Sequence, residues 1–131
     1  MYVAQYNAGG GDILADKELY ESLLLELRRG TLVLSVLSQL STPKYGYVLV
    51  QQLCEKGIAV DAGTLYPLLR RLESQGMLTS EWETTGAKPR KYYSRNEYGT
   101  ELYLKLRASW MEINNGMNQL FTEGESDHVG E

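Results

Sequence analysis

The sequence DAGTLYPLLRRLESQG, residues 61–76, predicts a short amphipathic helix. Four leucines recur at helical spacing and form one apolar face: Leu65, Leu68, Leu69 and Leu72. Asp61 is a good N-cap, and Gly76 stands where a helix commonly ends in a left-handed residue. The opposite face carries hydroxyls, an aromatic ring and adjacent arginines: Thr64, Tyr66, Pro67, Arg70, Arg71 and Ser74. Such a face suits a groove of DNA, and an ordinary surface helix with two solvated arginines is the alternative.

Pro67 departs from the usual placement of proline in helices. It lies six residues beyond Asp61, deeper than the first turn in which a proline is tolerated. Either the regular helix begins nearer Thr64, or its first turn is distorted around Gly63 and Pro67. Pro67 thus opposes the local helical preference on the proposed contact face. Functional sites are where function is expected to override such local preferences.

The composition predicts one folded domain. The chain has 131 residues, of which 43% are hydrophobic, and this is enough for a modest core. No apolar run is long enough to span a bilayer, and residues 1–12 lack the basic start and apolar block of a signal peptide. The single cysteine, Cys54, cannot form an intrachain disulfide, and we expect it to be a small core residue. No Cys/His group has metal-ligand spacing, so we expect no metal. Without a membrane span, a signal peptide or a disulfide, the simplest interpretation is a cytoplasmic protein, and we expect no cofactor.

Charge is distributed unevenly along the chain. Residues 1–27 carry one base and five acids, residues 28–95 carry ten bases and five acids, and residues 96–131 carry two bases and seven acids. A central segment of net charge +5 therefore lies between acidic ends, although the whole chain carries −4. This asymmetry favours a nucleic-acid partner for the middle of the chain, which the total charge alone would argue against.

Further helices are predicted before residue 61, and a hairpin after residue 76. Hydrophobic spacing predicts helices over residues 16–29, 31–40 and 45–56, after a flexible segment over residues 1–15 and with a turn at residues 41–44. Two strands are then predicted, over residues 77–84 and 90–95, around a turn that contains Gly86 and Pro89. The hairpin carries four bases: Lys88, Arg90, Lys91 and Arg95. Because it directly follows the helix with the two arginines, we expect both elements to share a phosphate-facing surface.

A long helix is predicted to follow the hairpin. Asn96 is a natural N-cap, and apolar residues then recur at steps close to a heptad seam: Leu102, Leu106, Trp110, Ile113, Met117 and Leu120. So long a helix has little core left to cover in a small domain, and we infer that residues 96–121 pair with another chain. Residues 122–131, which include the only histidine, His128, predict a disordered acidic tail.

This order of elements is that of a winged helix-turn-helix followed by a dimerisation helix, which is a mainly α fold with a small β-hairpin wing. Four segments carry a more specific resemblance: Arg29-Gly30-Thr31-Leu32, Tyr45-Gly46-Tyr47, Gly63 to Leu78, and Arg90-Lys91-Tyr92-Tyr93. With these segments, which span roughly residues 28–106, the chain resembles the PadR-like transcriptional regulators, and among them the subgroup with a single C-terminal helix. The DNA-binding domain would then cover residues 16–95.

The chain departs from the family pattern in three places, one of which is the single helix after the wing. After the paired tyrosines the family usually has Leu-Thr, two further residues and a glycine, whereas this chain has Arg95-Asn96 and then Gly99. Asn96 thus keeps a capping residue in place of the family's Thr, and Arg95 replaces the family's apolar Leu. The helix over residues 16–29 looks like an N-terminal extension, which varies among members.

The resemblance implies a homodimeric repressor that binds a pseudo-palindromic operator, often of detoxification, efflux or stress genes. By position, the residues that would enter the major groove are Thr64, Tyr66, Pro67 and Arg70, with Arg71 beside them. The residues that would touch phosphates are Tyr45 and Tyr47, and those that would place the wing on the backbone or in the minor groove are Lys88, Arg90 and Lys91. Base contacts specify the sequence, while phosphate contacts set register and affinity.

The resemblance also implies a dimer interface and a candidate effector site. In similar members, a tryptophan on the last helix can line a pore at the dimer centre and stack planar ligands, which makes Trp110 the candidate. The alternative is that Trp110 only packs the seam with Ile113 and Met117. We also expect the N-terminal helix to pack on the partner's last helix. The residues of the expected interface are Leu19, Leu23, Leu102, Leu106, Trp110, Ile113, Met117 and Leu120.

Two other classes compete with a DNA-binding regulator. Winged helices also serve as protein-interaction modules without specific DNA binding, and the acidic ends would fit that role. An enzyme is the weakest class. The only histidine lies in the tail, no glycine-rich phosphate loop follows a strand, and no nucleophile has a plausible base nearby.

Overall fold

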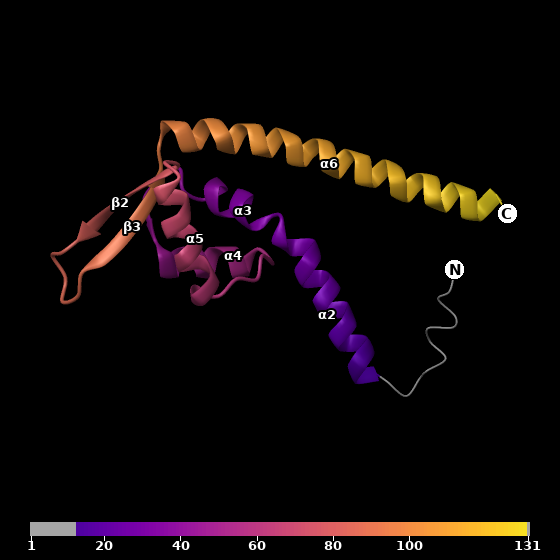
Figure 1. The fold of residues 1–131 in the computed structure, drawn as a ribbon, viewed down its shortest axis with the longest axis horizontal. Helices are drawn as coiled ribbons and strands as arrows, with labels where there is room; N and C mark the ends of the chain where they lie inside the picture. Colours follow the sequence, from indigo (N-terminus) through magenta and orange to yellow (C-terminus); the bar gives the residue numbers. More distant parts are fainter. Residues whose placement is uncertain (1–12, 131) are drawn as a thin grey trace. The chain divides into compact units, whose positions relative to one another are not determined.

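The fold consists of short helices, a small sheet and one long helix. The computed structural model describes residues 13–130, with side chains as far as residue 125. Its elements, drawn in Figure 1, are α2 (Ile13–Arg29), α3 (Leu32–Ser38), β1 (Lys44–Tyr45), α4 (Gly46–Glu55), α5 (Ala62–Ser74), β2 (Leu78–Glu83), β3 (Arg90–Arg95) and α6 (Glu97–Gly130). The chain divides into two units, residues 1–32 and residues 33–131, which are described separately below. This architecture confirms the expected fold class.

The described part of the first unit is dominated by α2. Its basic last turn, Arg28 and Arg29, suits the negative end of the helix dipole. Leucines on this helix are exposed in the single chain, for example Leu19 and Leu23. The helix begins at Ile13, three residues before the expected start. The rest of the flexible segment expected over residues 1–15 lies outside the described residues.

Helix α5 forms as its sequence predicts. The Asp61 carboxylate accepts a hydrogen bond from the amide of Thr64 at 2.8 Å and caps the first turn. Gly76 adopts a φ of 87° just beyond the helix, where a residue with a side chain would be strained. The helix begins at Ala62, so the alternative of a start nearer Thr64 is wrong. Pro67 lies inside the helix and removes only one hydrogen bond, the one to the carbonyl of Gly63.

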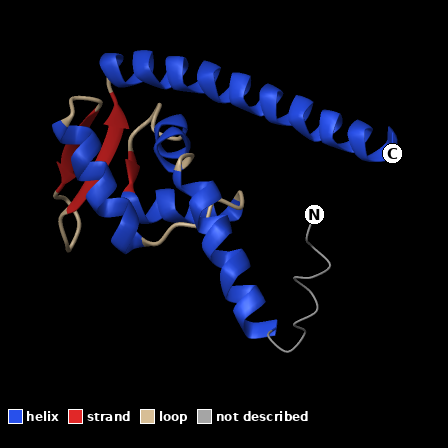
Figure 2. Cartoon of the chain, turned by 45° about the vertical axis from the view of Figure 1, so that its right-hand side comes forward, coloured by secondary structure: helices blue, strands red, loops and turns tan. Residues whose placement is uncertain are grey.

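The three strands form one antiparallel sheet in the order β1-β3-β2. Leu78 pairs with Arg95 and Trp82 with Lys91 in the hairpin, which confirms both predicted strands. The third strand, β1, pairs Lys44 with Tyr93 where we expected only a turn. A two-residue strand is too short to show alternation in sequence, and it exists because β3 offers it an open edge. Figure 2 shows the small sheet beside the short helices.

The core of the second unit gathers leucines from α3, α4, α5 and β2. Its buried apolar residues are Val36, Leu37, Leu40, Leu49, Leu53, Leu65, Leu68, Leu69, Leu72, Leu78 and Tyr93. All four leucines of the predicted apolar face of α5 are among them, which confirms that face. The expectation for Cys54 is wrong, because its side chain is exposed. Leu53 takes the inward position on α4, and the next residue along a helix points about 100° away from it.

Helix α6 leaves the end of β3 and continues as one uninterrupted helix (Figure 1). Asn96 caps it, because its side-chain oxygen accepts a hydrogen bond from the Gly99 amide at 2.8 Å. We expected a disordered tail from residue 122, but the helix extends to Gly130, and within it the Thr122 hydroxyl donates to the Asn118 carbonyl. Among the described residues, no helix combines the length and apolarity that crossing a bilayer requires.

Candidate nucleic-acid interface

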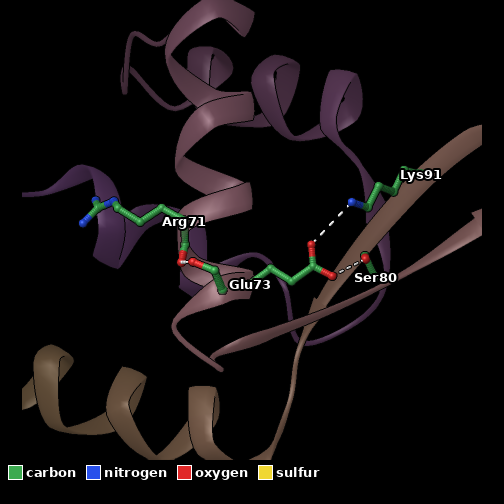
Figure 3. A network of polar contacts seen from close by, with 5 residues as sticks. Arg71, Glu73, Ser80 and Lys91 are labelled. Carbon is green, nitrogen blue, oxygen red and sulfur yellow. Dashed lines mark hydrogen bonds and ion pairs between the residues drawn. The ribbon is translucent and has the colours of Figure 1, made fainter.

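The outer face of α5 presents side chains that take no part in the core. Thr64, Pro67, Arg70 and Arg71 are all exposed. Neither arginine forms an ion pair with another described residue. Figure 3 shows the guanidinium group of Arg71 extending away from the polar network at the end of the helix. The face is therefore free to donate hydrogen bonds to a partner outside the domain, as groove recognition requires.

Tyr66, also expected on this face, has a second role. Its ring lies against Gly46 at the start of α4, so that a Cβ atom at position 46 would overlap the ring. Tyr66 is accordingly half-buried. Only glycine permits this close approach between α4 and α5. A glycine at the start of a helix, between two tyrosines, was the sequence signal for this contact.

The two tyrosines beside Gly46 form a stack with a wing arginine. The rings of Tyr45 and Tyr47 are nearly parallel, with centroids 5.8 Å apart. The guanidinium carbon of Arg90 lies 5.5 Å from the centroid of Tyr45 and 5.9 Å from that of Tyr47. Arg90 also approaches the Tyr47 hydroxyl, at 3.5 Å, while Tyr92 meets Tyr45 edge to face. The structure thus brings three predicted phosphate contacts into one cluster, held partly by cation–π attraction.

Lys91 does not join this cluster. Its ammonium group lies 3.4 Å from the carboxylate of Glu73 on α5, and the same carboxylate accepts a hydrogen bond from Ser80 on β2 (Figure 3). The ammonium also lies 5.2 Å from the ring centroid of Tyr93 and 5.8 Å from that of Trp82. Desolvation opposes the charged form, but interactions with Tyr93 and Glu73 outweigh it and raise the pKa of Lys91. Lys91 therefore already has partners within the domain.

The tip of the hairpin is the most exposed part of the wing. Lys88 and Arg90 are exposed there. The tip has its own turn structure, because the Glu83 carboxylate accepts hydrogen bonds from the hydroxyl and amide of Thr85, at 2.7 and 3.1 Å. These hydrogen bonds lower the pKa of Glu83, chiefly through the Thr85 hydroxyl. The wing thus offers Lys88 and Arg90 as its outward-facing charges.

Sequence reasoning missed two polar residues that organise this surface. Glu73 joins α5 to the wing, and Arg95 turns inward instead of joining the basic face of the hairpin. Their partners lie far away in the sequence: Lys91 is 18 residues from Glu73, and Leu37 is 58 residues from Arg95. Local periodicity contains no signal for such pairs.

The residues of the expected dimer seam remain outside the core of the single chain. On α6 the exposed fractions are 42% for Leu106, 40% for Trp110, 62% for Ile113, 41% for Met117 and 62% for Leu120. Leu102, nearest to the sheet, is half-buried. A row of large apolar side chains exposed along one helix favours an interface with another molecule.

Comparison with known proteins gives consistent results. The model of the transcriptional regulator PadR-like family matches residues 33–105. A PadR family transcriptional regulator from Eggerthella lenta shares 50% identity with a TM-score of 0.78, covering 82% of this chain and 96% of that protein. A PadR-like transcriptional regulator from Bacillus cereus shares 27% identity with a TM-score of 0.67, covering 73% and 96%. A transcriptional regulator from Mycobacterium tuberculosis is 35% identical over 69 residues, 53% of this chain, and the match spans 64% of that regulator's length. These relatives are regulators, not enzymes.

Proposed function

Because the chain belongs to the PadR-like family of transcriptional regulators, we propose that it is a cytoplasmic homodimeric repressor that binds a pseudo-palindromic operator through α5. The observation that carries this proposal is the outer face of α5. There two arginines that form no ion pair with any described residue stand beside an exposed threonine and proline, on a helix whose other face is buried. A short helix with these properties suits the major groove.

We divide the candidate DNA-binding residues according to their contacts within the protein. Thr64, Pro67, Arg70 and Arg71 are exposed on α5 and would face base edges or nearby phosphates. Tyr66 would contribute its outer edge, since its ring already packs on Gly46. The phosphate-binding groups would be Tyr45, Tyr47, Lys88 and Arg90. We assign Lys91 a different role, because its ammonium group is held by Glu73: it would set the position of the wing.

The stripe on α6 would form the dimer seam. Two such helices, packed along the residues from Leu102 to Leu120, would cover the exposed leucine, isoleucine and methionine side chains. The exposed leucines of α2, Leu19 and Leu23, would extend the same interface through the partner's last helix. A two-fold axis between the protomers would then match a two-fold operator.

Trp110 is our candidate for effector binding. It lies on the seam and is 40% exposed in the single chain, so a planar apolar molecule at the dimer centre could stack on its indole ring. By analogy with the family, release of the operator by such a molecule would induce detoxification, efflux or stress genes.

Fluorescence anisotropy tests the proposal. Labelled DNA from upstream of the protein's own gene is titrated beside a shuffled control at two salt concentrations. We expect tight binding to the upstream DNA alone, weakened by salt, because phosphate contacts release counterions. Equal, weak binding to both DNAs, together with no sequence enriched from random DNA, would contradict the proposal and favour a protein-interaction module.

A further inference from the structure

The start of α6 is joined to the DNA-binding unit without a loop. Strand β3 ends at Arg95 and α6 begins at Glu97, so that only Asn96 lies between them. With a connection this short, the contacts of a few residues at the joint determine the direction of α6. Helix α6 has 34 residues and is therefore about 50 Å long. Small changes at its base produce large movements at its far end.

The side chain of Arg95 connects three elements at this base. Its Nη1 donates a hydrogen bond of 2.6 Å to the carbonyl of Leu37 in the last turn of α3. Its Nε donates one of 3.0 Å to the hydroxyl of Thr100 in the first turn of α6. The guanidinium carbon lies 4.4 Å from the ring centroid of Tyr103, one turn further along α6. One planar group thus contacts both the last turn of α3 and the first two turns of α6.

Two neighbours of Arg95 tie the same base to the end of α5. The side-chain Nδ2 of Asn96 donates a hydrogen bond of 2.8 Å to the carbonyl of Gly76. Gly99 lies against the backbone of Met77, so closely that a Cβ atom there would overlap the Met77 carbonyl. Since Gly76 and Met77 directly follow α5, the direction of α6 is set relative to the recognition helix itself.

We propose that Arg95 is a positioning residue that sets the distance between the two recognition helices of the dimer, and hence the half-site spacing of the operator. This inference rests on the proposed function, namely that α5 reads DNA and that α6 pairs with a second copy. Helix α5 has 13 residues and its end is tied to the joint, so its first turn is about 20 Å from the joint. A rotation of about 10° at the joint would move that turn by roughly 3.5 Å, which is close to the rise of one base pair. A loosened joint would therefore tolerate spacings that the parent rejects.

The donors of Arg95 are directed inward, which separates this role from a DNA contact. Its Nη1 and Nε both have acceptors within the domain, and its guanidinium carbon lies over Tyr103. Replacing Arg95 should accordingly leave the affinity of one protomer for one half-site unchanged. A wing residue that touched phosphate would weaken binding to every DNA alike.

The test measures spacing preference. An operator is selected from random DNA with the parent protein, and its two half-sites are then moved apart or together by one and two base pairs. The parent and Arg95→Met are titrated with this series and with a single half-site, after gel filtration and far-ultraviolet circular dichroism have shown that both are folded dimers. Lys105→Met is the matched control, because Lys105 is an exposed α6 residue whose ion pair with Glu101 leaves 71% of its side chain accessible.

We expect the parent and Lys105→Met to prefer one spacing strongly, because binding both half-sites raises affinity by about 10²–10⁴. Arg95→Met should reduce that preference by roughly tenfold and bind the single half-site as the parent does. Arg95→Lys should behave like Arg95→Met, since an ammonium group lacks the planar fork that bridges α3 and α6. If Arg95→Met does not fold, Thr100→Val and Tyr103→Leu each remove one contact of the same group and should broaden the spacing preference.

Two results would overturn the inference. One is an unchanged spacing preference in the folded Arg95 variants or in both contact variants. The other is an equal loss on every DNA, including the single half-site, which would indicate a phosphate contact or a loss of folded protein. Failure of the parent to select any sequence would instead count against the proposed function on which the inference rests.

Discussion

The ammonium group of Lys91 in the wing lies 3.4 Å from the carboxylate of Glu73 in α5, and each side chain is about one third exposed, at 29% and 33%. A pair so close to solvent contributes little stability, about 1 kcal/mol or less. The geometry of the pair matters more than its energy. Because the Glu73 carboxylate also accepts a hydrogen bond from the Ser80 hydroxyl, it holds both strands of the hairpin. The wing is therefore held in position relative to α5 by contacts within the protein alone.

This pairing distinguishes two lysines of the wing. Lys88→Met removes an exposed charge at the tip, and we expect the slope of log affinity against log salt concentration to fall by about one. Lys91→Met should change that slope less, since Glu73 already neutralises the charge within the domain. Anisotropy titrations over a series of salt concentrations measure both slopes. An equal change in the two variants would show that Lys91 contacts phosphate.

The close approach of Gly46 and Tyr66 can be measured as a coupling energy. Gly46→Ala should reduce the free energy of unfolding by about 1 kcal/mol, because the new methyl group displaces the ring of Tyr66. In the Tyr66→Leu background the same substitution should have little effect. A double-mutant cycle in urea should therefore give a coupling of at least about 0.5 kcal/mol. Additive effects would show that the ring does not constrain position 46.

Gly99 provides a test of the joint at the base of α6. A helical glycine replaced by alanine normally gains stability, by up to about 1 kcal/mol. At position 99 we expect a loss of about 1–3 kcal/mol instead, because the Cβ atom would overlap the rigid backbone of Met77.

The control for this prediction is Gly30→Ala. Gly30 is exposed, has no left-handed φ and has open space around it. The free energy of unfolding of Gly30→Ala should therefore differ from that of the parent by less than about 1 kcal/mol. Both variants are unfolded in urea at one protein concentration, since dimerisation of the proposed kind would add to the apparent stability. A Gly99→Ala protein as stable as the parent would contradict the packing at the joint.

Trp110 can be observed by fluorescence once Trp82 is replaced. Trp82→Phe keeps an aromatic ring near Lys91 and leaves Trp110 as the only tryptophan. If the dimer centre binds planar apolar molecules, some members of a diverse aromatic panel should quench or shift this emission in a saturable manner. Trp110→Leu should abolish binding measured by calorimetry. If no compound in the panel changes the emission, Trp110 only packs the seam.

The local elements of this fold could be predicted from the sequence, because their signals are local. The leucine spacing and the Asp61 cap define α5, and the change of period after Gly76 defines the hairpin. The long-range polar contacts could not be predicted in this way. Arg95 and Lys91 look like the other bases of the hairpin, and only the folded chain shows that one reaches α3 and the other reaches Glu73.

Errors at the boundaries have similarly local causes. Strand β1 has two residues and no pattern of its own, so it depends entirely on pairing with β3. The predicted end of the last helix is too early, because the acidic composition of residues 122–131 predicts a disordered tail, whereas Thr122 and its neighbours continue α6. The prediction for Cys54 is wrong because it rests on the usual burial of free cysteines. On α4 this residue lies beside the buried stripe and not in it, and it is exposed.

Selection from random DNA, with the parent and Arg70→Ala in parallel, tests most directly whether α5 reads the operator. The parent should enrich a two-fold symmetric motif. Arg70→Ala should enrich the same motif with one base pair degenerate in each half-site. Its binding to the parent's motif should be weaker than the parent's by about 1–3 kcal/mol. If Arg70→Ala enriches a motif identical to the parent's, or if the parent enriches none, the assignment of α5 as the recognition helix is wrong.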